Sequence, residues 1–258
     1  MSKSKIEWTS HTWNPTVGCS KVSAGCDRCY AIMQAARLQG MGKPGYAGVV
    51  TTPADTAKGK RLNWTGKVNL VESALEIPLK IKKPTMFFVD SMSDLFHENV
   101  PFDFNRRFMG IVKQCPQHIF QVLTKRPERM LEFFMWIISR GQYPMAFPNL
   151  WLGVSVEEEI HLDRIDTLRK IPAAIRMLSI EPLLEDLGEI NLEEIHWVIV
   201  GGESGPKARP MRIEWAEAVM EQCKQAGVAF YMKQIIKNRK KIKFEDFPEN
   251  LKVREYPK

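Results

Sequence analysis

The sequence predicts an α/β fold, a partial barrel of parallel strands with helices on the outside. Six apolar segments of strand length recur between residues 86 and 232. Polar residues follow each of them, and segments with helical periodicity separate several of them. A strand followed by a crossover helix, repeated six times, specifies a parallel sheet. With one more strand near the N-terminus, about seven βα units fit a barrel or partial barrel of the TIM type.

The N-terminal third of the chain is predicted to hold one strand, one helix and a long excursion. The first strand spans residues 13–17 and leads into a loop with three cysteines. Residues 31–39 have helical composition, and Gly40 is a natural helix stop. The sequence beyond Gly40 is rich in Gly, Pro and Thr, so residues 40–84 are expected to form an irregular excursion.

The later strands and helices follow from the same patterns. The predicted strands are residues 86–89, 119–123, 150–154, 175–178, 197–200 and 228–232. Helical patterns cover residues 104–113, 128–139, 161–170 and 213–225. In such a barrel the carboxyl ends of the strands form the active face.

Polar residues are predicted to meet at this carboxyl edge. The residues that follow the strands are Asp94, Lys125, Glu157, Glu181, Glu203 and Gln234. The cysteine-containing loop follows the first strand, so it joins the same edge. Loops between strands and helices are polar in any case, so each residue taken alone also fits a solvated loop. Their convergence predicts a functional site at this edge.

The size fits one large domain or two small ones, and the repeated strand–helix pattern favours a single globular domain over residues 1–258. This domain would include the excursion at 40–84 and a basic C-terminal segment at 235–258. The chain has 258 residues, of which 44% are hydrophobic and 26% charged, which excludes a disordered chain or a coiled coil. The longest apolar run, residues 133–138, is far short of the roughly 20 residues of a membrane-spanning helix. The first residues lack the apolar stretch of a secretory signal, so we expect no membrane association and a cytoplasmic location.

The formal net charge of +7 is concentrated in two stretches. Residues 233–243 contain six basic residues and no acidic one, and residues 58–83 contain seven basic and two acidic residues. Such patches suit phosphate-bearing partners, because neutralising phosphates releases counterions. An ordinary solvated surface explains the same lysines, so a nucleic acid or nucleotide partner is one of two open interpretations.

Three of the five cysteines, Cys19, Cys26 and Cys29, lie close together. An odd cluster in a chain without a signal sequence argues against a disulfide framework and favours metal binding. Zinc prefers four protein ligands, and His11 could complete such a set. An iron–sulfur cluster held by three cysteines instead leaves one iron open to a substrate or cofactor. The cysteine pattern alone is compatible with zinc and with an iron–sulfur cluster.

Nine segments of the chain, taken in order, carry a resemblance to a known family. They are TWNPTVGC (12–19), GCDRCYA (25–31), DSMSDLFH (90–97), LTKRPER (123–129), WLGVSVE (151–157), LSIEPL (178–183), VIVGGESGP (198–206), ARPM (208–211) and FYMKQ (230–234). Together they resemble the three-Cys-motif phage protein family, a radical-SAM-like group of phages and bacteria. The resemblance spans nearly the whole chain.

This resemblance implies a [4Fe-4S] cluster on the three cysteines, with S-adenosyl-L-methionine chelating the fourth iron. An electron from a flavodoxin-type or ferredoxin-type donor would cleave the sulfonium and release a 5′-deoxyadenosyl radical that removes hydrogen from substrate. A partner protein encoded beside the gene is a further implied partner. The chain departs from the commonest radical-SAM pattern in the longer first gap and in having Arg28, not an aromatic residue, before Cys29.

The resemblance also implies cofactor-binding residues at the strand ends. Ser91, Ser93 and Asp94 would hold the methionine amino group, and Ser155 and Glu157 the ribose hydroxyls. The other cofactor candidates are Tyr30, Glu181, Gly201, Gly202 and Glu203. Gly201 and Gly202 resemble a glycine-rich methionine-binding motif, but close approach to adenine or phosphate, or a simple tight turn, explains them equally.

The candidate substrate-binding residues are Lys125, Arg126, Arg209, Lys233 and Gln234. The two arginines are expected to hold a phosphate or carboxylate by a two-pronged contact. The leading hypothesis is a radical-SAM enzyme that acts on a nucleic acid or a modified nucleotide base, for example in phage DNA thymidine hypermodification. The alternatives are a zinc-bearing nucleic-acid-binding protein without catalysis, and a radical-SAM enzyme acting on a peptide or metabolite.

Overall fold

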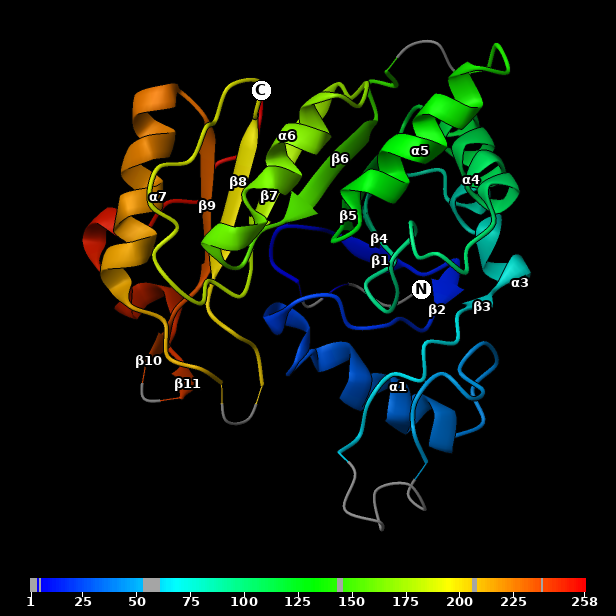
Figure 1. Ribbon diagram of the computed structural model, residues 1–258, viewed down its shortest axis with the longest axis horizontal. Coiled ribbons are helices and arrows are strands. Elements are labelled where there is room, and N and C mark those ends of the chain that lie inside the picture. The colour runs from blue at the N-terminus through cyan, green and yellow to red at the C-terminus, as the bar shows by residue number, and fades with distance from the viewer. Residues whose placement is uncertain (1–3, 5, 53–60, 143–145, 206–207, 238) are drawn as a thin grey trace.

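Seven parallel strands form one curled sheet, a partial barrel whose spatial order is also the order of the chain (Figure 1). The computed structural model describes all residues except 1–3, 5, 53–60, 143–145, 206–207 and 238. The strands are β1 (His11–Trp13), β4 (Met86–Val89), β5 (Ile119–Thr124), β6 (Leu150–Ser155), β7 (Ile175–Ile180), β8 (Trp197–Gly201) and β9 (Ala229–Gln234). The predicted α/β class and parallel sheet are confirmed.

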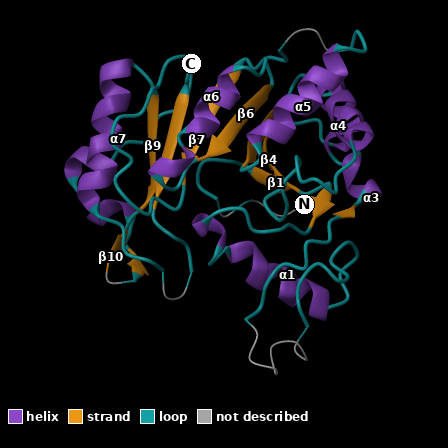
Figure 2. Ribbon diagram, viewed as in Figure 1, coloured by secondary structure: helices purple, strands orange, loops and turns teal. Residues whose placement is uncertain are grey.

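Helices cover the outer face of this sheet (Figure 2). They are α4 (Phe102–Gln114), α5 (Pro127–Ile138), α6 (Asp163–Arg169) and α7 (Ile213–Ala226), while α1 (Tyr30–Gly40) follows the cysteines. The expectation of six crossover helices is wrong between β7 and β8, where the described residues 181–196 contain turns and no helix. Pro182 and the positive φ of 62° at Gly188 interrupt any helical pattern there.

The first strand begins and ends earlier than predicted. β1 pairs in parallel with β4, with Trp13 opposite Val89, and Pro15 then separates it from β2 (Thr16–Val17). β2 pairs with β3 (Asn69–Leu70), outside the main sheet. Proline lacks the N–H that a central strand needs, so the predicted single strand over residues 13–17 divides at this point.

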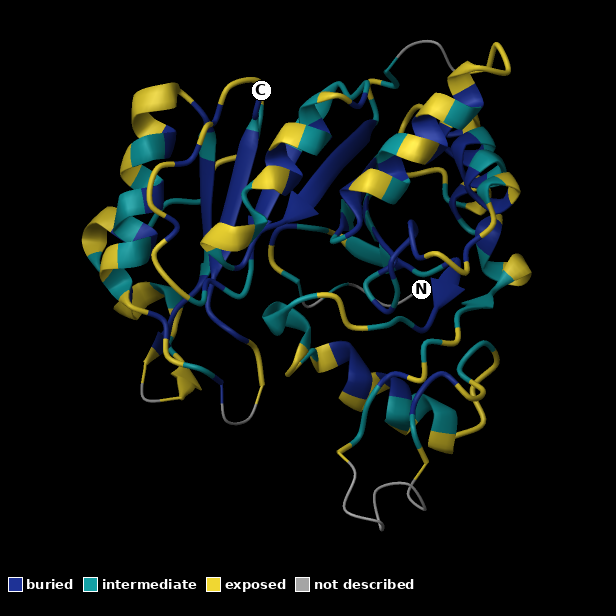
Figure 3. Cartoon of the chain, viewed as in Figure 1, coloured by how far each residue is buried: buried dark blue, intermediate teal, exposed yellow. Residues whose placement is uncertain are grey.

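The strands of the sheet are largely buried, as their dark blue colour in Figure 3 shows. Apolar side chains form a core on each face of the sheet. The larger core lies under the helices and includes Phe87, Phe108 and Phe120. A second core on the other face gathers around Trp8, whose ring is 4.7 Å from that of Phe88 and 6.0 Å from that of Trp197. Parallel sheets are stable when both faces are covered in this way.

The excursion at residues 40–84 is more ordered than predicted in its described part. It contains β3, the short helix α3 (Glu72–Leu75) and the turn Pro78–Lys80. Its Val49, Val50 and Trp64 pack with α1 in a third apolar cluster. Cys19 and Cys29 pack against the same cluster. The excursion therefore contributes to the apolar cluster that packs against two of the three cysteines.

The basic C-terminal segment turns back along the sheet. It begins with the hairpin strands β10 (Ile236–Lys237) and β11 (Lys240–Lys241). Farther on, the N–H of Met232 donates to the carbonyl of Val253 at 2.8 Å. None of the helices in the described part of the chain has the length and apolarity to cross a bilayer.

Candidate functional site

The cysteine loop, residues 18–29, begins against the carboxyl end of β4. The Gly18 N–H donates to the carbonyl of Met92 at 3.1 Å, and the Ser93 hydroxyl donates to the carbonyl of Gly18 at 2.6 Å. Gly18 has a φ of 102°, and an added Cβ would collide with the carbonyl oxygen of Lys67. Only glycine combines that conformation with so close an approach. The loop is thereby set at the edge where the predicted site residues lie.

The three cysteines of this loop are unpaired thiols of intermediate exposure. Burial raises the pKa of Cys19 to about 12; the carboxylate of Asp94 and the neighbouring Cys26 add to the increase, and Arg126 opposes it. Burial also raises the pKa of Cys29, with a further contribution from Cys26. Cys26 is therefore close enough to both other thiols to disfavour their negative charge.

Thiolates are soft ligands, so the three thiols of this loop suit an iron–sulfur cluster as well as zinc. Within the described part of the chain, no group of three or more His, Cys, Asp or Glu side chains is arranged to hold a metal ion. In a cubane each cysteine binds a different iron, so its ligands need not converge on one point. His11 starts β1, whereas the cysteine loop follows its carboxyl end. Three soft thiols on one loop are a suitable donor set for an iron–sulfur cluster.

A first anchor of the cysteine loop comes from Arg126, directly after β5. Its Nη2 donates to the Oγ of Ser20 at 2.7 Å and to the Ser20 carbonyl at 3.1 Å. Its Nη1 lies 3.1 Å from Oδ2 of Asp94 and 3.9 Å from the sulfur of Cys19. Arg126 therefore joins the Cys19 end of the loop to the sheet.

Asp94 is buried beneath this arginine and is fully engaged with the protein. The Thr124 hydroxyl donates to its Oδ1 at 2.7 Å, and the Lys125 N–H donates to its Oδ2 at 3.2 Å. Of the neighbouring candidates, Ser91 donates through its hydroxyl to Oδ1 of Asn14 at 3.0 Å, and Ser93 bonds to the loop as described. These three predicted cofactor residues therefore lie together under the loop.

A second anchor is Glu157, directly after β6. Its Oε1 accepts a 2.9 Å hydrogen bond from the Ser23 hydroxyl and pairs with Lys125, and its Oε2 accepts from Nη1 of Arg164 at 2.9 Å. Burial alone would raise the pKa of Glu157, but Lys125, Arg164 and Ser23 together hold it below its ordinary value. Glu157 is therefore a buried anion whose partners include the loop itself.

A third anchor joins the loop to the end of β8. Nη2 of Arg209 donates to the carbonyl of Ala24 at 2.9 Å, and its Nε donates to Oε1 of Glu203 at 3.0 Å. Arg28 of the loop lies 3.6 Å from Oε2 of the same Glu203. The two arginines predicted to grip a substrate anion, Arg126 and Arg209, are thus both paired with carboxylates of the protein.

The remaining predicted residues lie at the ends of β6 to β9 and beside α1. Ser155 accepts through its carbonyl from Arg164 at 2.7 Å, and Lys233 pairs with Glu181 at 2.7 Å. The Gln234 amide donates to the carbonyl of Gly202 at 2.6 Å. A Cβ on Gly201 would lie 2.7 Å from Oε1 of Glu181, and one on Gly202 would lie 2.7 Å from Ile236, so close packing requires both glycines. The Tyr30 hydroxyl donates to the carbonyl of Ser91 at 3.0 Å, while 43% of the residue stays exposed.

Several residues that position the loop had no sequence signal of their own. Ser20 and Ser23 are small polar loop residues, and Arg164 lies buried on the predicted helix before β7. His97 is likewise buried, with its Nε2 2.9 Å from Oγ of Ser20. Their role in holding the loop depends on hydrogen-bond partners far away along the chain, which local sequence patterns do not reveal.

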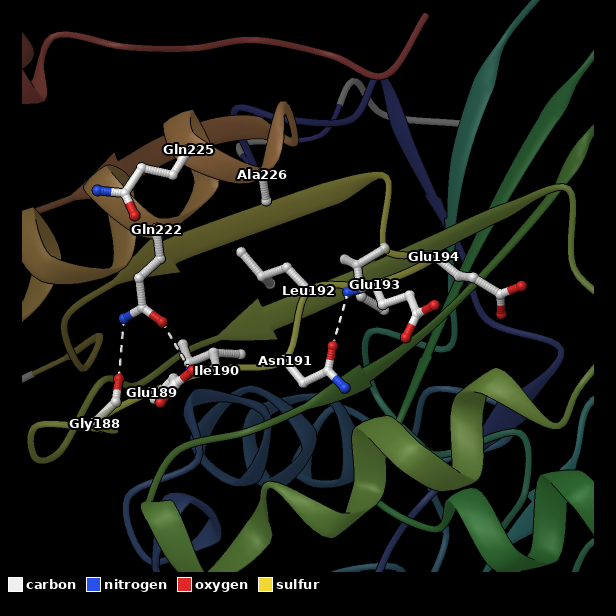
Figure 4. A pocket seen from close by; sticks show the side chains of 11 residues that line it. Gly188, Glu189, Ile190, Asn191, Leu192, Glu193, Glu194, Gln222, Gln225 and Ala226 are labelled. Carbon is white, nitrogen blue, oxygen red and sulfur yellow. Dashed lines mark hydrogen bonds between the residues drawn. The ribbon is translucent and has the colours of Figure 1, made fainter.

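One pocket lies at the opposite edge of the sheet, beside the end of α7 (Figure 4). Its walls are residues 188–195 with Gln222, Gln225 and Ala226. Gln222 accepts from the N–H of Ile190 at 2.7 Å and donates to the carbonyl of Gly188 at 2.9 Å, which ties the loop to the helix. None of the predicted site residues lines this pocket.

Comparison with known proteins assigns the chain to a family. No curated protein and no solved structure matches it. A family model described as a protein of unknown function, DUF5131, matches residues 3–252. This range includes the cysteine loop, its three anchors and all seven strands of the sheet. Since the match covers nearly the whole chain, the protein belongs to the DUF5131 family.

Proposed function

We propose that this protein is a radical S-adenosylmethionine enzyme with a [4Fe-4S] cluster on Cys19, Cys26 and Cys29. The observation that carries the proposal is the set of three unpaired thiols on one loop at the carboxyl edge of a partial βα barrel. Three cysteine ligands leave one iron of a cubane open. When bound, the cluster would supply the electron that cleaves S-adenosylmethionine to a 5′-deoxyadenosyl radical.

In this proposal the residues of the chain position the cysteine loop, bind and orient the cofactor, and shield the site from water. The anchors at Arg126, Glu157 and Arg209 keep the loop in one position. The third apolar cluster packs against Cys19 and Cys29 and excludes water from that side. Tyr30 follows Cys29 directly and is 43% exposed as a residue, so it is the candidate for stacking on adenine.

The carboxylates at this edge are candidates for orienting the cofactor. Most of them would act indirectly, because they bind protein groups that hold the cysteine loop. Asp94 and Glu157 already bind protein donors, so each would act by keeping the loop in position. Ser91, Ser93 and Ser155 remain candidates for the methionine and ribose groups, and Gly201, Gly202, Glu181 and Glu203 for the rest of the cofactor. Lys125, Lys233 and Gln234 are then the candidates on the substrate side, whereas Arg126 and Arg209 act by holding the loop.

The proposed substrate is a nucleic acid or a modified nucleotide base. Support comes from the β10–β11 hairpin, in which Lys237, Arg239 and Lys240 are exposed. The hairpin begins two residues after Gln234, which lies at the candidate site. Exposed cations next to an active site suit a polyanionic substrate, because they bind its phosphates without reading its sequence.

Anaerobic purification and reconstitution test the cofactor. The wild-type protein is expected to bind about four irons, and with a reductant and S-adenosylmethionine it is expected to yield 5′-deoxyadenosine. Cys26→Ala should abolish the product, whereas Cys115→Ala, which removes a thiol buried in the main core, should not. Stoichiometric zinc without iron would contradict the proposal and favour the zinc-bearing alternative.

A further inference from the structure

We propose that Arg126 is a positioning residue, which holds the Cys19 end of the loop before a cluster is bound and favours the reduced cluster afterwards. The second half of this inference rests on the proposed function. The first half concerns the protein alone, and the two halves are tested by separate measurements.

Arg126 is held in position both at its backbone and at its guanidinium. The Arg126 N–H donates to the Thr124 hydroxyl oxygen at 2.9 Å, and that hydroxyl donates in turn to Asp94. Asp94 also accepts from Nη1 of Arg126 at 3.1 Å. The arginine is only 8% exposed, so few alternative side-chain positions are open to it. Such a side chain is preorganised, and holding the loop costs it little further entropy.

The planar guanidinium contacts Asp94 at the edge of the sheet and Ser20 of the loop at the same time. Nη2 makes two hydrogen bonds to Ser20, while Nη1 faces both Asp94 and the sulfur of Cys19 at 3.9 Å. His97 supports the same serine, with its Nε2 2.9 Å from Oγ. Its Nδ1 accepts from the N–H of Asn99 at 3.1 Å, which leaves Nε2 as the donor. Lysine has no comparable fork and could not make all of these contacts together.

The positive charge of Arg126 also lies close to the sulfur of Cys19. Two anions lie near it, Asp94 in the interior and Glu98, whose Oε2 is 3.6 Å from Nε and which is exposed to solvent. Reduction of a cluster adds negative charge to its sulfur ligands, and a nearby cation stabilises that charge. Removing the cation while keeping the shape should therefore lower the midpoint potential.

Hydrogen exchange of the metal-free protein tests the first half. Arg126→Gln removes the hydrogen bonds to Ser20, so amides of the cysteine loop should exchange roughly tenfold faster or more. The matched control is Arg129→Gln on α5, since Arg129 pairs with Glu132 at the surface. Ser20→Ala removes only the acceptor hydroxyl, so it should accelerate exchange in the same loop to a smaller extent. This second variant keeps the test decisive if Arg126→Gln does not fold. Unchanged exchange in either site variant would overturn this half.

A redox titration followed by electron paramagnetic resonance tests the second half. If the wild-type protein assembles a cluster, Arg126→Gln should lower its midpoint potential, and Arg126→Lys should restore part of the difference. A potential equal to that of the wild-type protein would overturn the electrostatic role. Failure of the wild-type protein to assemble any cluster would overturn this half together with the proposed function, whereas the exchange experiment would still decide the first half.

Discussion

Gly25 and Glu157 approach each other so closely that no larger residue fits at position 25. An added Cβ would lie 2.6 Å from Cγ of Glu157. That carboxylate cannot retreat easily, because Lys125, Arg164 and Ser23 hold it. A single methyl group should therefore displace the cysteine loop and not the glutamate.

Gly25→Ala is predicted to destabilise the loop by about 1–3 kcal/mol and to reduce iron loading in reconstitution. Limited proteolysis and iron content measure the two effects. The control is Gly40→Ala, where an added Cβ would meet nothing within 4 Å. If both alanine variants behave alike, the close contact with Glu157 is not what keeps the loop in place.

Asp90 is a buried carboxyl group that follows β4 directly and lies beside Thr16 of β2. Thr16 donates to it through its N–H at 3.0 Å and its hydroxyl at 2.9 Å. Burial raises the pKa of Asp90 to about 8; the Thr16 hydrogen bonds lower it, and Asp94 raises it further. Between roughly pH 4 and pH 8 the folded protein therefore keeps a proton that the unfolded chain has lost, and stability falls as the pH rises.

Asp90→Asn should remove this dependence, because the amide has no proton to lose. Asparagine also tolerates the positive φ of 55° at this position. We expect the decline in unfolding free energy between pH 5 and pH 8, of the order of 1 kcal/mol per pH unit in the wild-type protein, to disappear in the variant. Urea denaturation at several pH values measures it, with the exposed Asp103→Asn as control. Parallel curves for wild type and Asp90→Asn would contradict the buried-proton interpretation.

At the scale of elements, strands were easier to predict than their ends or their connections. All seven parallel strands overlap predicted segments, because apolar runs bounded by polar residues are typical of buried parallel strands. The break at Pro15 and the helix-free connection before β8 arise from single residues that interrupt a pattern. The N-terminal segment carrying Trp8 had no strand or helix signal, yet it fills the second core.

Trp8→Ala is predicted to lower the free energy of unfolding by about 3–5 kcal/mol, the usual cost of emptying a large buried aromatic site. Trp8 is 2% exposed and packs edge-on against Phe88 and Trp197. Chemical denaturation followed by circular dichroism measures the change. Met33→Ala on α1, where the methionine is 67% exposed, should cost little. A loss at Trp8 no larger than at Met33 would mean that the segment is not part of the core.

At the scale of the whole molecule, the sequence predicted which residues share an edge but not how they bond. The anchors join residues that are 106, 134 and 185 positions apart, at Ser20–Arg126, Ser23–Glu157 and Ala24–Arg209. Periodicity carries no information on such pairs, because it reports only local exposure. The predicted anion-binding arginines illustrate the limit, since their observed partners are carboxylates within the protein.

The basic hairpin predicts a salt-dependent affinity for nucleic acid. Changing the exposed Lys237, Arg239 and Lys240 of the hairpin together to Gln should weaken binding several-fold at low salt and reduce the slope of log affinity against log salt. The matched control changes Lys113, Lys170 and Lys224, which are exposed near the opposite edge of the sheet. Equal losses in the two triple variants, or affinity that does not respond to salt, would exclude the hairpin as the binding surface.

In the proposed enzyme, three thiols hold a cluster with one iron open to S-adenosylmethionine. The electron paramagnetic resonance spectrum of the reduced, reconstituted protein, recorded with and without S-adenosylmethionine, tests whether that iron is open. We expect a [4Fe-4S] signal that changes when the cofactor is added and that is lost in Cys26→Ala. A cluster signal that ignores the cofactor, or a protein that binds one zinc and no iron, would contradict it.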